Sequence, residues 1–100
     1  MNVVELSEAA AADLDDIRDA SEAGWGQAQR DRYMDGFTAV FRNIAAMPGL
    51  GQPVDFAEPD LRRTSHGSHL IFYRLEGEQI TISRILHMNM DAPRHRGSWS

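Results

Sequence analysis

Four histidines and ten arginines are the residues of this 100-residue chain whose side chains could carry acid–base or phosphate chemistry. Cleavage of RNA by its own 2′-hydroxyl needs a base, an acid and a cation beside the phosphate. Arg62, Arg74 and Arg84 could supply the cation, and the histidines could move protons. The histidines are His66, His69, His87 and His95. Residue types alone establish no geometry, so they permit ribonuclease chemistry without predicting it.

The residue types that are missing narrow the chemistry further. The chain contains no lysine and no cysteine. Schiff bases, phosphate-binding P-loop lysines, disulfides, thiolate zinc sites and cysteine nucleophiles are therefore excluded. His66 and His69 are spaced like a metal-binding pair, but no third ligand follows at a recognisable spacing. We predict no metal site and no cofactor; we expect His69 and His87 to be hydrogen-bonded structural residues, and His66 to be solvated in a turn.

The charge is divided unevenly along the chain. Residues 1–60 carry four arginines against twelve acidic residues, whereas residues 61–100 carry six against three, for a total of −5. The second half should therefore build a positive surface. Arginine recognises carboxylates in a bidentate manner, so Arg62, Arg74 and Arg84 are candidates for pairing with an acidic partner. The acidic total argues against direct binding of nucleic acid.

The first half of the sequence predicts a short strand at residues 4–6 and a helical hairpin. Ser7 is suited to cap the first helix, which should end at Gly24. Its apolar positions recur at helical spacing, and we expect its acidic flank to be solvated. The apolar positions are Ala10, Leu14 and Ile17, and Ser21 follows at the same spacing. The acidic flank is Asp13, Asp15, Asp16 and Asp19.

A second helix is predicted by the strongest periodic pattern in the chain. Its apolar stripe consists of Tyr33, Phe37, Val40, Phe41 and Ile44. Gly36 within this helix suggests close approach of the first helix, because glycine costs about 1 kcal/mol relative to alanine there. We expect Trp25, Tyr33 and Phe37 to lie in the core of the hairpin, with a binding surface as the alternative. A loop should run from Met47 to about residue 60.

From residue 61 the hydrophobic period changes to two, which predicts strands at 61–64, 69–75 and 79–87 in an antiparallel meander. The fold class is therefore α+β, a single domain over residues 1–96, with residues 97–100 expected to form a disordered tail. No apolar run approaches the roughly 20 residues of a membrane span. The N-terminus also lacks the features of a signal peptide, so we expect a cytoplasmic protein.

Strict alternation would give both faces of this sheet apolar residues. Ile80, Ile82, Arg84 and Leu86 would share one face of the last strand, opposite Thr81, Ser83, Ile85 and His87. A helical hairpin can cover only one face. The other should be left for a protein partner, for the chain's own tail, or for a second copy of the chain.

Several strings of residues, taken together, resemble the ParE toxins of the RelE/ParE superfamily. The similarity runs from about Leu6 to His95, and the two longest strings are the most specific. Leu61 stands where the family often has glycine, and Met47 where it often has asparagine. The strings are Trp25-Gly26 with Ala28 and Tyr33, Met47-Pro48 with Gly51, Leu61-Arg62, residues 67–74 (Gly-Ser-His-Leu-Ile-Phe-Tyr-Arg), residues 82–87 (Ile-Ser-Arg-Ile-Leu-His), and Met90-Asp91 with Arg94-His95.

The resemblance implies a toxin of a type II toxin–antitoxin, or plasmid stabilisation, system with a strand, helical hairpin and three-stranded meander. Such toxins inhibit DNA gyrase by protein binding. A ParD-like antitoxin neutralises them by laying a C-terminal segment, which folds on binding, along the hairpin and sheet. Candidate antitoxin contacts are Arg62, Arg74, Arg84, Tyr73 and Trp25, and candidate gyrase contacts are Arg94, His95 and Arg96. No residue is assigned a catalytic role.

Two alternatives stay open. The RelE branch of the superfamily cleaves messenger RNA on the ribosome, which would make this chain an enzyme. That branch uses a basic cluster containing lysine, which this chain lacks. A pure interaction module without toxicity fits the exposed sheet face equally well.

Overall fold

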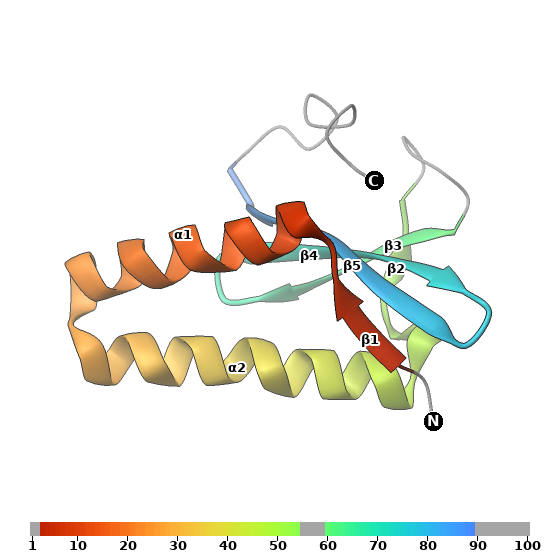
Figure 1. Cartoon of the computed structure of the whole chain (residues 1–100), viewed down its shortest axis with the longest axis horizontal. Coiled ribbons are helices and arrows are strands. Elements are labelled where there is room, and N and C mark those ends of the chain that lie inside the picture. Colours follow the sequence, from red (N-terminus) through yellow and green to blue (C-terminus); the bar gives the residue numbers. More distant parts are fainter. Residues whose placement is uncertain (1–2, 55–59, 90–100) are drawn as a thin grey trace.

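A helical hairpin packs along one face of a five-stranded sheet (Figure 1). The computed structural model describes residues 3–54 and 60–89. The helices are α1 (Glu8–Trp25) and α2 (Gln27–Ala46), followed by a short 3-10 turn, η1 (Pro48–Leu50). The strands are β1 (Val3–Leu6), β2 (Gln52–Pro53), β3 (Leu61–His66), β4 (His69–Glu76) and β5 (Gln79–His87). The predicted α+β class and meander are confirmed, and β2 is an addition to them.

The sheet has the order β1-β5-β4-β3-β2. β1 pairs with β5 in parallel, whereas β5, β4, β3 and β2 pair antiparallel in turn. The first strand of the chain therefore lies beside the last. No described helix is long and apolar enough to cross a membrane.

The connection between the helices differs from the prediction. Ser7 caps α1 as expected, since its hydroxyl accepts a hydrogen bond from the Ala10 N–H at 3.0 Å. The helix does not end at Gly24, however, but continues to Trp25. Gly26 makes the turn with a φ of +84°. It donates to the Glu22 carbonyl and accepts from the Arg30 N–H, so one glycine ends α1 and begins α2.

A β-bulge changes which residues of β5 face the helices. Tyr73 pairs with Ile82 and Phe72 pairs with Arg84, which leaves Ser83 as an extra residue in β5. A bulge of one residue shifts the alternation that follows it. Ile85 therefore joins Ile82 in the core beneath the helices. The prediction of strict alternation along β5 was wrong from Ser83 onward.

The described residues form a hydrophobic cluster on each face of the sheet. The larger cluster lies between the hairpin and the sheet and includes Phe37, Ile44 and Tyr73. The smaller one lies on the opposite face, here called the outer face, and contains Phe72 and Leu86. The predicted apolar stripe of α2 supplies its side of the larger cluster.

Gly36 is a place of close approach, as predicted, but the neighbour is not α1. A Cβ atom added to Gly36 would overlap the ring of His66 on β3. The ring accordingly fills the space that a side chain at position 36 would need. Gly36 therefore permits β3 to pack against α2.

Candidate functional site

Asp13 and Arg84 join α1 to the free part of β5. β1 covers β5 only as far as Ile82, and α1 begins alongside the next residues. The Asp13 carboxylate accepts from Arg84 Nε at 2.8 Å and Arg84 Nη2 at 2.9 Å. It also accepts from the Ile85 N–H at 2.9 Å, where a neighbouring strand would otherwise bond. The expectation that Asp13 is a solvated charge was wrong.

This pairing changes the role of Arg84. Its side chain is 14% exposed and that of Asp13 is 13% exposed. Hydrogen bonds to Asp13 raise the pKa of the Arg84 guanidinium above its usual range. Arg84 therefore already has a carboxylate partner within the chain, so it holds α1 on the sheet instead of presenting a vacant cation.

Three histidines gather with Tyr33 at the end of the sheet nearest the α1–α2 connection. His66 Nε2 donates to the Tyr33 carbonyl at 2.9 Å, and its ring lies 4.6 Å from the Tyr33 ring. The Tyr33 hydroxyl lies 2.6 Å from His69 Nδ1. The rings of His69 and His87 are 5.4 Å apart, edge to face. His66 is thus packed and bonded, and the expectation of a solvated residue was wrong.

Each of these three histidines has a hydrogen-bonding partner within the protein. His87 Nδ1 accepts from the Asn89 N–H at 3.1 Å, which matches the structural role predicted for it. Burial lowers the pKa of the His69 imidazole below its ordinary value of 6.5, and His87 and His66 lower it further. A neutral His69 suits its contact with the Tyr33 hydroxyl. Within residues 3–54 and 60–89, no three His, Asp or Glu residues are placed to hold a metal ion.

A groove of about 370 Å³ opens beside this histidine cluster, between α1 and the end of β5. We call it the α1–β5 groove. Trp25 stands at the groove and is 51% exposed, so its predicted place in the hairpin core was wrong. Its ring still contacts Tyr33 edge to face, with centroids 5.5 Å apart. The residues that line the groove include Ile17, Ala20, Ser21, Trp25, His69 and His87.

The remaining predicted contacts do not form one surface. Tyr73 has no exposed surface, and its hydroxyl bonds the Gly51 N–H at 2.7 Å and the Pro48 carbonyl at 2.9 Å. Arg62 Nη1 donates to the Gly51 carbonyl at 2.7 Å. Both residues therefore hold the loop after α2, and Tyr73 cannot contact a partner from this position. Arg74 is half-buried on the outer face, opposite Leu61.

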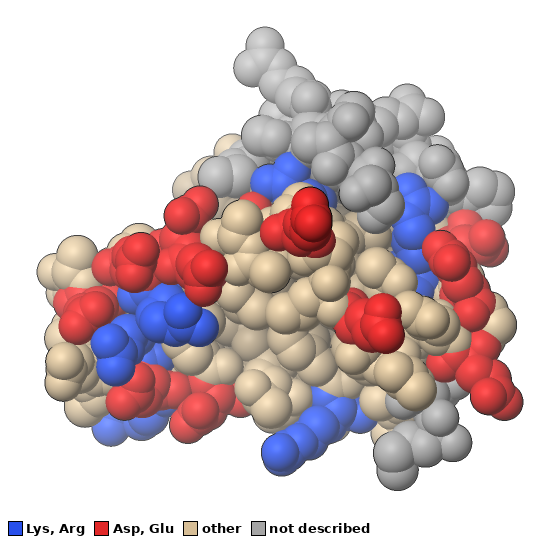
Figure 2. All heavy atoms as spheres, viewed as in Figure 1, with Lys and Arg blue, Asp and Glu red and all other residues tan. Residues whose placement is uncertain are grey.

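Charge is also distributed unevenly over the hairpin surface. Figure 2 shows acidic and arginine side chains gathered around the α1–α2 connection, and a largely uncharged region toward β1. Part of the charged region consists of local pairs, such as Arg30 with Glu22 at 3.2 Å. Arg94, His95 and Arg96, the predicted gyrase contacts, lie outside the described residues, as does the predicted tail at 97–100.

Sequence reasoning missed Asp13 and the groove, although one signal was present. Asp13 lies four residues before Ile17 and eight before Ser21, on the face of α1 that is buried. An acidic residue on an apolar face usually has a partner. The partner itself could not be read from the sequence, because Arg84 reaches Asp13 only after the bulge at Ser83.

Comparison with known proteins agrees with this architecture. A family model described as "ParE toxin of type II toxin-antitoxin system, parDE" matches residues 4–92. A protein named Toxin ParE1 from Caulobacter vibrioides is 42% identical over 97 residues, which cover 97% of this chain and 100% of that relative. A Toxin ParE1 from Mycobacterium tuberculosis is 38% identical over 91 residues, covering 90% of this chain and 93% of the relative.

A solved structure described as "Chromosomal ParDE TA system from P. aeruginosa" contains a chain of similar fold. The TM-score is 0.73 at 21% identity, with 87% of this chain and 96% of the other covered. The family model spans most of the described strands and both helices, and the relatives match along nearly their whole length. The chain therefore belongs to the ParE toxin family of type II toxin–antitoxin systems.

Proposed function

We propose that this chain is the toxin of a ParD–ParE pair, that it inhibits DNA gyrase by binding it, and that a ParD-like antitoxin neutralises it. The observation that carries the proposal is the 42% identity with a Toxin ParE1 over the full length of that relative. The solved neighbour is described as a ParDE system, which supports an antitoxin as partner.

The placement of the acid–base groups favours binding over RNA cleavage. His66 and His69 are engaged with Tyr33, and Arg84 is engaged with Asp13. A ribonuclease would need such groups to converge on a phosphate. We therefore propose that the toxin acts without catalysis of its own.

The α1–β5 groove is the surface we propose for the antitoxin. Ile17, Ala20 and Trp25 offer apolar contacts along α1, and His87 offers a polar edge. An amphipathic helix recognises such a groove with its apolar face. Arg74 remains a proposed contact on the outer face, whereas Arg62, Arg84 and Tyr73 are used within the fold. Arg94, His95 and Arg96 remain the proposed contacts to gyrase.

Induction of the chain in bacteria tests the proposal. We expect growth arrest with blocked DNA replication and intact messenger RNA, and recovery when a ParD-like antitoxin is expressed with it. Cleaved transcripts would instead indicate a ribosome-dependent endonuclease. Normal growth at high expression would indicate an interaction module without toxicity.

A variant series separates the two proposed surfaces. Replacing Arg94, His95 and Arg96 by alanine should abolish growth arrest while antitoxin binding persists. Replacing Trp25 by alanine should weaken antitoxin binding while growth arrest persists. The opposite assignment of either effect would contradict the proposed surfaces.

A further inference from the structure

The outer edge of β3 is covered over only part of its length. β3 pairs with β4 at all six positions from Leu61 to His66. On its other side, β2 pairs only with Arg62 and Arg63. No described strand lies beside the rest of this edge, residues 64–66.

The backbone of Ser65 faces this open edge. The Leu61 carbonyl points away from β4, because it accepts from the Val54 N–H at 3.1 Å. The Asp60 carbonyl points toward β4, where it accepts from the Leu75 N–H at 3.3 Å. The direction of the backbone groups alternates along a strand. The N–H and C=O groups of Arg63 and Ser65 therefore also point away from β4. The N–H and C=O of Ser65 are therefore available where β2 has already ended.

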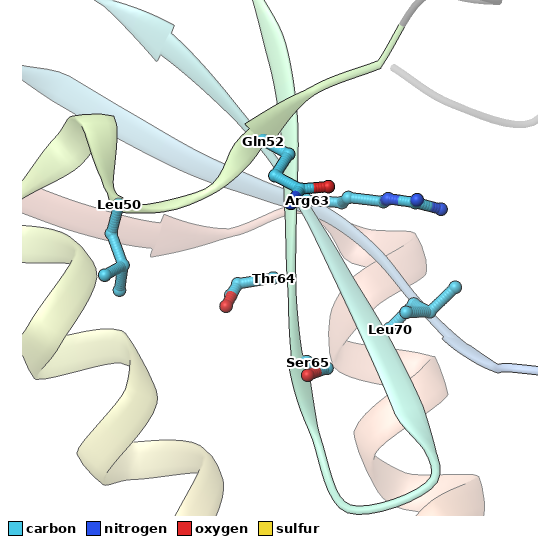
Figure 3. Close-up of a pocket in the computed structure, with 6 residues that line it drawn as sticks. All are labelled: Leu50, Gln52, Arg63, Thr64, Ser65 and Leu70. Atoms are coloured by element: carbon cyan, nitrogen blue, oxygen red, sulfur yellow. The ribbon is translucent and has the colours of Figure 1, made fainter.

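A cavity of about 360 Å³ follows the same edge (Figure 3). Its lining combines four polar residues with two leucines. Arg63 is exposed, and within residues 3–54 and 60–89 its guanidinium makes no ion pair. The lining residues are Leu50, Gln52, Arg63, Thr64, Ser65 and Leu70.

We propose that this edge accepts an extended segment of the antitoxin as an added strand, with an acidic side chain placed beside Arg63. This inference rests on the proposed function. Strand addition uses backbone hydrogen bonds for affinity and alternate side-chain positions for specificity. Arg63 and Ser65 lie on the outer face of β3, whereas Thr64 lies on the hairpin face. The added segment should alternate accordingly, with its acidic residue toward Arg63 and an apolar residue toward Thr64 and Leu50.

Amide hydrogen exchange on the wild-type toxin tests the strand directly. In the free toxin the Ser65 amide should exchange rapidly, because its N–H has no partner among the described residues. In the complex with full-length antitoxin it should slow by at least about 100-fold, as expected for a hydrogen bond in a stable sheet. Formation of the complex with no change at Ser65 overturns the inference but leaves the proposed function intact. Failure to form any complex contradicts both.

Matched variants test the same point through affinity. Ser65→Pro removes the outward N–H and breaks no bond of the β3–β4 ladder, so it should weaken antitoxin binding by about 10-fold. Leu6→Pro makes the corresponding change on the other edge of the sheet, at β1, and should stay within about 2-fold. Arg63→Glu should cost about 10-fold and Arg42→Glu, an exposed site on α2, about 2-fold or less. Loss of affinity in Leu6→Pro alone would place the added strand at β1 and overturn the inference.

Discussion

At the scale of single residues, Asp13 connects α1 to β5, a role that the sequence analysis did not predict. One carboxylate satisfies both the Arg84 guanidinium and the Ile85 N–H. Both side chains are largely shielded from water. Removing one member of such a pair leaves the charge of the other shielded from water and unpaired. This lowers the free energy of unfolding by more than the loss of a surface ion pair.

Asp13→Ala should therefore lower the free energy of unfolding by about 2–4 kcal/mol. Asp19→Ala, at an exposed site on the same helix, should change it by about 0.5 kcal/mol or less. Urea denaturation followed by circular dichroism measures both values. Equal effects of the two substitutions would show that the Asp13–Arg84 pair contributes no more than a surface charge.

His69 gives the molecule a predicted dependence on pH. Its pKa in the folded state lies below the ordinary value of 6.5, chiefly because of burial. As pH falls through that value, the unfolded chain binds a proton more readily than the folded one. The stability is therefore complete above the unfolded pKa and is lost progressively as the pH falls below it. Asp13 and Asp16 line a pocket together with His69, and carboxylates there would oppose this trend.

Denaturation at several pH values between 5 and 8 checks the sign. The free energy of unfolding should fall toward the acidic end in the wild type, and His69→Gln should make the curve flatter. The comparison between the two proteins isolates the contribution of His69 to the pH dependence. A steeper fall in His69→Gln would contradict the assignment.

At the scale of elements, the sequence predicts most of what the backbone does and less of how the elements meet. The helical period of α2, the hydroxyl cap at Ser7 and the period of two from Leu61 are local properties. Each is therefore visible in a few consecutive residues. The bulge at Ser83 and the packing of His66 on Gly36 depend on contacts between distant segments. No local pattern encodes them, so the predicted faces of β5 and the predicted neighbour of Gly36 were wrong.

The contact between α2 and β3 can be tested through its glycine. Gly36→Ala improves helix propensity by about 1 kcal/mol, yet the added methyl group would overlap the His66 ring. We expect a net destabilisation of about 1–3 kcal/mol. Gly24→Ala on α1 meets nothing within 4 Å and should be stabilising by about 0.5–1 kcal/mol.

The double variant Gly36→Ala, His66→Ala isolates the cause. With the ring removed, the alanine at position 36 should no longer be penalised and should stabilise the His66→Ala protein. Unfolding midpoints measured for all four proteins give the coupling. An unchanged penalty in the His66→Ala background would mean that the ring is not the obstacle.

At the scale of the whole molecule, the division of charge found in the sequence has a spatial meaning. The acidic first half forms the hairpin and the two short strands β1 and β2, and the second half supplies β3, β4 and β5 with their arginines. The predicted single surface of Arg62, Arg74 and Arg84 is replaced by separate roles, because Arg84 pairs with Asp13 of α1 and Arg62 bonds the Gly51 carbonyl. The groove and the β3 edge are the surfaces that we propose for the antitoxin.

Trp25 should matter to the partner and not to the fold. It is half-exposed at the α1–β5 groove, and large aromatic residues at such positions often dominate binding. Trp25→Ala should weaken antitoxin binding by about 10- to 100-fold. Met47→Ala, at an exposed site beyond the other end of α2, should leave it within about 2-fold. Calorimetric titration with antitoxin measures both, and equal losses would contradict a docking role for the groove.

The central claim is that this toxin acts on DNA gyrase by binding and without catalysis of its own. The most direct measurement is a supercoiling and DNA-cleavage assay with purified gyrase and purified toxin, with and without ParD-like antitoxin. We predict inhibition that saturates with toxin concentration and disappears when antitoxin is added in equal amount. Unchanged supercoiling and cleavage at saturating toxin, with antitoxin binding intact, would contradict the claim.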